Sequence, residues 1–121
     1  MIAGDLRFAD SFGYTRADSG DELVIVSVSI INDSDIGIRK QYSQFTDFQL
    51  QGGSGDIRRP IIVLGLDHQL GSGELASGGQ TSGWVAFEIR KGDRNLILQY
   101  HPCLILCEEQ DIPLKETYRP V

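Results

Sequence analysis

Residues 74–100 decide the fold and read ELASGGQTSGWVAFEIRKGDRNLILQY. Apolar residues alternate with other residues at a period of two, which predicts one strand at Ser82–Arg90 and a second at Asn95–His101. The polar residues Lys91–Arg94 between them predict a hairpin connection, in which Gly92 is available for a positive φ. Consecutive strands of this kind indicate an all-β protein.

Each of these two predicted strands has one face suited to a core. Val85, Phe87 and Ile89 share one face of the first strand. The matching face of the second strand consists of Leu96, Leu98 and Tyr100. Trp84 falls on the face opposite Phe87, so we expect it under a loop, under the N-terminal segment or at an interface. Structural burial and a partner-binding surface both remain open for this side chain.

Strand and turn signals recur along the rest of the chain. Glu22–Ile31 is the clearest strand, because β-branched residues occupy one of its faces. Other predicted strands lie around Leu6 and Phe8 and at Thr46–Gln51. Turns or loops are predicted at Asn32–Asp35, Gln51–Asp56 and Gly71–Gly79. We therefore expect one domain, residues 1–121, with an immunoglobulin-like β-sandwich of about seven or eight mostly antiparallel strands.

Composition and charge exclude several classes of function. The chain has 121 residues and a net charge of −6, which argues against binding a nucleic-acid backbone. Its basic residues, among them Arg58, Arg59, Arg90, Lys91 and Arg94, are interpreted as solvated turns. The longest apolar runs, Ile61–Leu64 and Cys103–Cys107, are far shorter than the roughly 20 residues of a membrane span, so no transmembrane segment is predicted. No signal peptide is visible at the start, which fits either a cytoplasmic protein or a removed export segment.

A series of motifs follows in a fixed order along the chain. The strand Val24–Ile31 ends in Asn32–Asp35, Asp47–Leu50 precedes a glycine pair, and Leu75–Gly79 leads to Gly83–Ile89. This order resembles a bacterial domain family of unknown function with an immunoglobulin-like fold, grouped with the mycobacterial immunoprotective extracellular antigen. The resemblance covers nearly the whole chain. It implies export, often as a lipoprotein, and it transfers no catalytic or ligand-binding residue.

His101, Cys103 and Cys107 form the one cluster of soft metal ligands in the sequence. A zinc site would need a fourth ligand, such as His68 or a residue of a second chain, and the spacing matches no common zinc motif. The alternative is that one cysteine packs in the core as a small apolar residue. A thiol nucleophile at Cys103, activated by His101, is disfavoured because no orienting or oxyanion-binding group is marked in the sequence.

Four further segments are candidate sites. Asp33 and Asp35 carry calcium-type oxygens, but the surrounding pattern of an EF-hand loop is absent, so a plain turn is favoured. The glycine-rich loops Gly52–Asp56 and Gly71–Gly79 lack the helix and the Lys of a phosphate-binding loop. Gln41–Phe45 is predicted to form a polar and aromatic loop at one end of the sandwich, either as a recognition loop or as an ordinary connection.

The sequence therefore assigns no catalytic, cofactor-binding or metal residue and no cofactor. We expect a protein that is not an enzyme: an extracytoplasmic binding module whose partner is an unknown protein or cell-envelope component, with no nucleic acid bound. A structural or assembly domain that pairs through strand edges is the alternative, and a zinc- or thiol-dependent enzyme is least favoured. A monomer or weak homo-oligomer is expected. By family resemblance the location is extracellular or in the cell envelope, with the cytoplasm as the alternative.

Overall fold

The computed structural model describes residues 1–101 and 110–114, and every regular element in these ranges is a β-strand. In chain order the strands are β1 (Ile2–Ala9), β2 (Ser11–Phe12), β3 (Thr15–Arg16), β4 (Asp21–Ile31), β5 (Lys40–Ser43), β6 (Phe48–Gln51), β7 (Ile57–Arg58), β8 (Ser72–Leu75), β9 (Gln80–Arg90), β10 (Ile97–Tyr100) and β11 (Gln110–Pro113). Three of them, β2, β3 and β7, have two residues each, and the remaining eight have four or more. The prediction of an all-β protein is confirmed.

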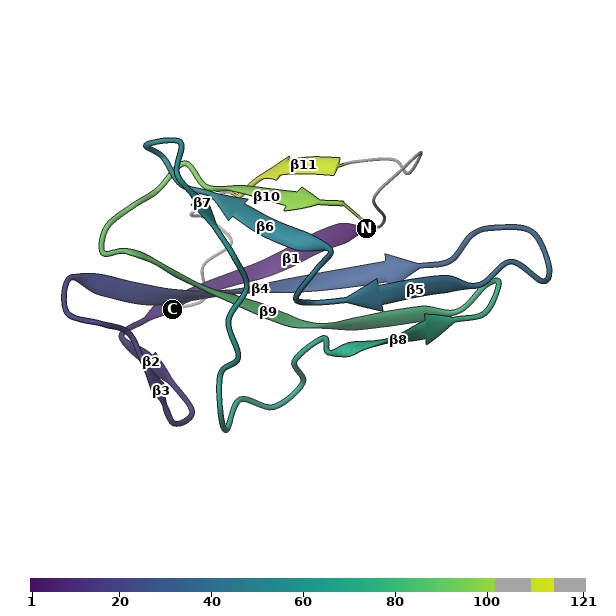
Figure 1. Cartoon of the computed structure of the whole chain (residues 1–121), viewed down its shortest axis with the longest axis horizontal. Helices are drawn as coiled ribbons and strands as arrows, with labels where there is room; N and C mark the ends of the chain where they lie inside the picture. The colour runs from purple at the N-terminus through teal and green to yellow at the C-terminus, as the bar shows by residue number, and fades with distance from the viewer. Residues whose placement is uncertain (102–109, 115–121) are drawn as a thin grey trace.

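Two sheets lie face to face in Figure 1. One has three strands in the order β1-β4-β9, and the other has four in the order β11-β10-β6-β7. Neighbouring strands within both sheets are antiparallel. Two small pairs, β2–β3 and β5–β8, form separate two-stranded sheets. The arrangement is a sandwich, consistent with the predicted immunoglobulin-like class.

The main core fills the space between the two sheets. Phe87 of β9 is completely buried there and belongs to a cluster that draws residues from both sheets. The residues of the predicted inward faces in this cluster are Val24, Val26, Val28, Ile30, Phe48, Leu50, Val85, Ile89, Leu96, Leu98 and Tyr100. Each fully buried aliphatic or Phe side chain contributes roughly 1.5–3 kcal/mol, so this cluster is the main source of stability.

The predicted hairpin between residues 90 and 95 is wrong. Strands β9 and β10 belong to different sheets, so the connection between them crosses from one sheet to the other. Arg94 in this connection forms an ion pair with the buried Glu22 of β4 at 2.7 Å, and the Gly92 N–H donates to the same carboxylate at 3.0 Å. Gly92 does have the expected positive φ, at 84°. The prediction failed because two strands with one apolar face each show the same alternating sequence pattern in two arrangements. They can pair within one sheet, or they can face each other across a core.

Two segments that were predicted to be loops contain a strand pair. Strand β5 lies within the predicted Gln41–Phe45 loop except for its first residue, and β8 lies within the predicted Gly71–Gly79 loop. They pair antiparallel from Lys40 opposite Leu75 to Ser43 opposite Ser72. These strands are rich in polar residues, and their pairing depends on each other rather than on an alternating apolar pattern. Neither segment therefore shows the alternating apolar pattern that would predict a strand from the sequence.

Candidate functional site

A second, smaller layer covers the outer face of the β1-β4-β9 sheet. It consists of the β2–β3 hairpin and of residues 59–71, both of which extend below that sheet in the view of Figure 1. We call these two segments the covering layer. Under it lies a separate apolar cluster in which Ile25, Val63 and Ala86 are buried and Phe12, Ile61, Leu66 and Trp84 are partly buried. The outer face of β9 is therefore packed as well as the inner one.

Trp84 lies within this second cluster, as its position opposite Phe87 led us to expect. The backbone of β9 at Trp84 bonds twice with the covering layer: its N–H donates to the His68 carbonyl at 2.8 Å, and its carbonyl accepts from the Leu70 N–H at 2.9 Å. On β1, the Arg7 guanidinium lies 4.9 Å from the centroid of the indole ring. Of the places expected from the sequence, Trp84 takes the one under a loop, where it is partly buried.

Gly83 allows the covering layer to approach β9 closely. A Cβ atom at this position would lie 2.6 Å from the Leu70 nitrogen and 2.7 Å from the His68 oxygen, which is closer than real contacts permit. Gly83 thus admits the backbone at His68 and Leu70, while Trp84 on the opposite face of β9 packs in the second cluster.

The covering layer holds three large apolar side chains out in solvent. Tyr14 at the turn of the β2–β3 hairpin is 89% exposed, and Ile62 and Leu64 in the longer segment are 59% and 63% exposed. We call these three residues the apolar tip. Single exposed apolar residues are ordinary, but a group of them marks an interaction site more often than a lone one does.

The two parts of the apolar tip are bonded to each other, although about 50 residues separate them in the sequence. The Tyr14 N–H donates to the Leu64 carbonyl at 2.6 Å, and the Leu64 N–H donates to Thr15 Oγ1 at 2.8 Å. The Tyr14 ring lies against Gly65, where a Cβ would come within 2.6 Å of a ring carbon. These contacts fix the hairpin against the longer segment.

The Gln69 side chain forms hydrogen bonds within residues 59–71, the longer segment of the covering layer. Its side-chain amide donates to the carbonyls of Val63 at 2.7 Å and Leu66 at 3.1 Å, and its oxygen accepts from the Val63 N–H at 3.3 Å. Three polar backbone groups of a segment with no regular strand are thus satisfied by one side chain. The apolar tip is therefore displayed on an ordered support.

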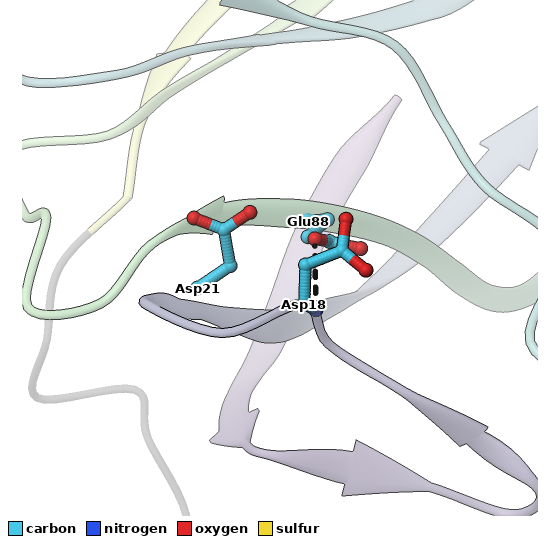
Figure 2. A group of neighbouring side chains, drawn as sticks. All are labelled: Asp18, Asp21 and Glu88. Atoms are coloured by element: carbon cyan, nitrogen blue, oxygen red, sulfur yellow. Dashed lines mark hydrogen bonds between the residues drawn. The ribbon is translucent and has the colours of Figure 1, made fainter.

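A cluster of three carboxylates lies at the base of the same hairpin (Figure 2). Asp18 follows β3, Asp21 begins β4, and Glu88 lies on the outer face of β9; their oxygens come within 4.8 Å of one another. The Asp18 N–H donates to Glu88 Oε2 at 3.1 Å. Partial burial raises the pKa of Glu88, and its hydrogen bond with Asp21 and the charges of both aspartates raise it further.

These three residues are the one group of three His, Cys, Asp or Glu side chains within the described ranges whose geometry could hold a metal ion. Carboxylate oxygens are the ligands that calcium and magnesium prefer. The sequence gave no indication of this group, because Glu88 is 67 or more positions from the two aspartates. Asp33 and Asp35, which were weighed as calcium ligands, are both exposed and lie in the predicted turn.

A second exposed apolar loop lies at the opposite end of the molecule, between β4 and β5 (Figure 1). Ile36 is 98% exposed and Ile38 is 53% exposed. The loop is supported by buried Asn32, whose amide donates to the carbonyls of Ile38 at 2.8 Å and Leu75 at 3.0 Å. Asn32, at the start of the predicted turn Asn32–Asp35, thus joins this loop to the end of β8.

The segment predicted as a recognition loop, Gln41–Phe45, is largely integrated into the fold. Besides forming β5, it places buried Gln44 so that its side-chain oxygen accepts from the Gly71 N–H at 2.6 Å. Nearby, burial raises the pKa of Tyr100 to about 12, with a further contribution from the charge of Asp47. Burial also raises the pKa of Asp47 itself, against the lowering effect of the hydrogen bond from the Ser43 N–H.

The residues considered and disfavoured as zinc ligands are placed only in part. Cys103 and Cys107 lie outside the described residues, so the zinc and thiol hypotheses stay untested. His101 directly follows β10, and its N–H donates to the Asp47 carbonyl at 2.7 Å. His68 is exposed in the covering layer and has a positive φ of 61°.

Three of the five basic residues considered from the sequence, Arg58, Lys91 and Arg94, form ion pairs with acidic residues. Arg58 pairs with Asp56 at 2.8 Å and Lys91 pairs with Asp10 at 3.2 Å. A hollow of about 260 Å³ between the β6–β7 turn and the sheet crossing is lined by Ser54, Asp56, Arg90, Lys91, Gly92 and Asp93. Its charges are mixed, so it forms no basic surface of the kind that a nucleic acid requires.

Comparison with known proteins places the chain in a family. Residues 6–110 match the model of the domain of unknown function DUF4352, and the chain belongs to this family. No match to a curated protein reaches significance.

Two solved structures share the fold. The Bacillus subtilis protein ycdA, described as a "putative lipoprotein", aligns with 93% of this chain at 14% identity and a TM-score of 0.76. The chain spans 35% of the length of that protein. The yjhA protein of Bacillus subtilis aligns with 95% of this chain and 85% of its own length, at 21% identity and a TM-score of 0.65. Within the described residues, no helix is long and apolar enough to cross a membrane.

Proposed function

We propose that the chain is a single non-enzymatic domain that binds a protein partner outside the cytoplasm through the apolar tip. The observation that carries the proposal is the display of Tyr14, Ile62 and Leu64 in solvent on a support fixed by backbone bonds. Apolar side chains exposed to water favour association, because binding removes their surface from water. The rigid frame helps as well, because little conformational entropy remains to be lost on binding.

The proposed location rests on similarity. The ycdA protein is described as a candidate lipoprotein, and a lipoprotein is anchored to a membrane surface. The sequence also resembles the group that contains the mycobacterial immunoprotective extracellular antigen. Both point to the cell envelope or the extracellular space for this domain, and a protein or other envelope component at that surface is the corresponding partner.

A structural role through strand edges is the second candidate. In the described part of the chain, β1 pairs only with β4, which leaves its other edge available to a strand of another molecule. This edge carries exposed charges at Asp5 and Arg7, and the register shifts between Ala3 and Leu6. Charges and irregular register are the usual protections of an edge against pairing, so the apolar tip is the better supported surface.

Site-specific photo-crosslinking tests the proposal. A photo-reactive phenylalanine analogue at position 64 should form a crosslink to one defined protein in cells that express the domain. The same analogue at Ile57, which is 46% exposed on β7, serves as the matched control and should not give that product. The captured protein, once purified, should bind the wild-type domain directly. Equal crosslinking at both positions, or none at position 64, would contradict the proposal.

A further inference from the structure

We propose that the occupant of the apolar tip is a basic protein segment, whose apolar side chains contact Tyr14 and Leu64 while a Lys or Arg faces the carboxylate cluster. This inference rests on the proposed function and names the chemistry of the partner. It follows from the β2–β3 hairpin, which has Tyr14 of the apolar tip at its turn and Asp18 of the carboxylate cluster at its base.

The two surfaces are close enough for one short segment to cover both. Tyr14 and Asp18 are four positions apart, so their Cα atoms can lie no more than about 14 Å apart. Strand β3 joins them directly, and Figure 2 shows the hairpin leading away from the carboxylates. About four or five residues of an extended partner segment span such a distance.

No ion pair within the described ranges joins the carboxylate cluster to a cation, although the exposed Arg90 lies opposite Asp21 in the register of β4 and β9. The ion pairs found there join Arg39 to Glu74, Arg58 to Asp56, Lys91 to Asp10 and Arg94 to Glu22, so none involves the cluster. Asp18, Asp21 and Glu88 face one another instead, and their repulsion contributes to the raised pKa of Glu88. A Lys or Arg from a partner would relieve this repulsion, which makes a basic group the complementary one.

A second copy of the chain fits this surface less well. The chain carries a net charge of −6, and a symmetric contact through the hairpin would bring two such clusters toward each other. Like charges across an interface are unfavourable, whereas a basic partner is attracted to the same surface and guided onto it.

Selection from a random dodecapeptide library displayed on phage tests the inference without knowledge of the natural partner. The purified domain should enrich peptides that combine Lys or Arg with aromatic or branched aliphatic residues. Binding of a synthetic copy of an enriched peptide should weaken at least tenfold in Leu64→Ser and in the double variant Asp18→Asn, Asp21→Asn. It should also weaken steeply as salt is raised, since exposed charges are screened.

Matched variants distinguish the loss of this particular binding surface from the loss of any exposed apolar or charged side chain. Ile57→Ser removes an exposed apolar residue on β7, and Asp33→Asn with Asp35→Asn removes two exposed charges at the other end of the molecule. Both should bind the peptide like the wild type. Thermal unfolding of each variant, compared with the wild type, verifies that the fold is retained.

The outcomes distinguish the inference from the proposed function. If enriched peptides need Leu64 but lack basic residues, or bind the aspartate variant equally well, the inference is wrong and the binding role stands. If no peptide is enriched and no crosslink forms at position 64, both are wrong. Saturable calcium binding that is lost in Asp18→Asn would assign the carboxylates to a cation and would also overturn the inference.

Discussion

The two faces of strand β9 differ in what covers them. On the inner face Val85, Phe87 and Ile89 are completely buried by the opposite sheet. On the outer face Trp84 is buried only in part, by a segment without regular strands. The inner face packs in the main core, whereas the outer face supports the covering layer, which carries the exposed apolar tip. One strand thus joins the core of the domain to its candidate binding surface.

The largest effect is expected on the inner face. Phe87→Ala should lower the free energy of unfolding by about 3–5 kcal/mol, because it removes a fully buried aromatic ring and leaves a cavity. Denaturant unfolding measures the change. Phe45→Ala, at a Phe that is 42% exposed, is the control and should cost much less. Equal costs would mean that the burial assigned to the two residues is wrong.

A smaller but more selective effect is expected at the contact between β9 and the covering layer. Gly83→Ala should cost about 1–3 kcal/mol, since its methyl group would overlap the backbone at His68 and Leu70. Gly4→Ala on β1 is the control, because a methyl group there meets its nearest atom at an ordinary 3.6 Å. Denaturant unfolding compares the two. If Gly83→Ala is no more destabilising than Gly4→Ala, the close approach is not needed for stability.

A local effect is expected inside the covering layer. Gln69→Ala removes the side-chain bonds to Val63 and Leu66, so it should cost about 1–2 kcal/mol. Hydrogen exchange should accelerate at residues 62–66 more than at β4 or at the inner positions of β9. Uniform acceleration across the domain would show that the layer does not open independently of the core.

The smallest effect is a change in pH dependence on the outer face. The pKa of Glu88 is raised in the folded protein, so its contribution to stability is present at low pH and is lost as the pH rises through the folded pKa. Glu88→Gln should therefore flatten a decline in stability that the wild type shows on going from acidic to neutral pH. Unfolding measured over this range tests the sign. A steeper decline in the variant would contradict the account.

The two faces of β9 also differ in how far the sequence could predict them. Alternation around Phe87 predicted the buried inner face, whereas the position of Trp84 on the other face left open a loop, the N-terminal segment or an interface as its cover. The sheet crossing after β9 was missed, because the contact of Arg94 with Glu22 depends on residues 72 positions apart.

The candidate site was missed for a similar reason. Tyr14 and Leu64 lie in short segments without periodicity, and neither stands out until the fold brings them together. One local signal was available: each has a neighbouring glycine with a positive φ, 56° at Gly13 and 81° at Gly65. Such glycines mark turns, but they do not tell which two turns meet.

The most direct test of the proposed binding role is the affinity of the purified, crosslink-identified partner for three forms of the domain. These are the wild type, Leu64→Ser on the covering layer and Ile57→Ser on β7. The account predicts that the dissociation constant rises at least tenfold for Leu64→Ser and stays unchanged for Ile57→Ser, with both variants folded. Equal affinity for Leu64→Ser and the wild type would contradict it.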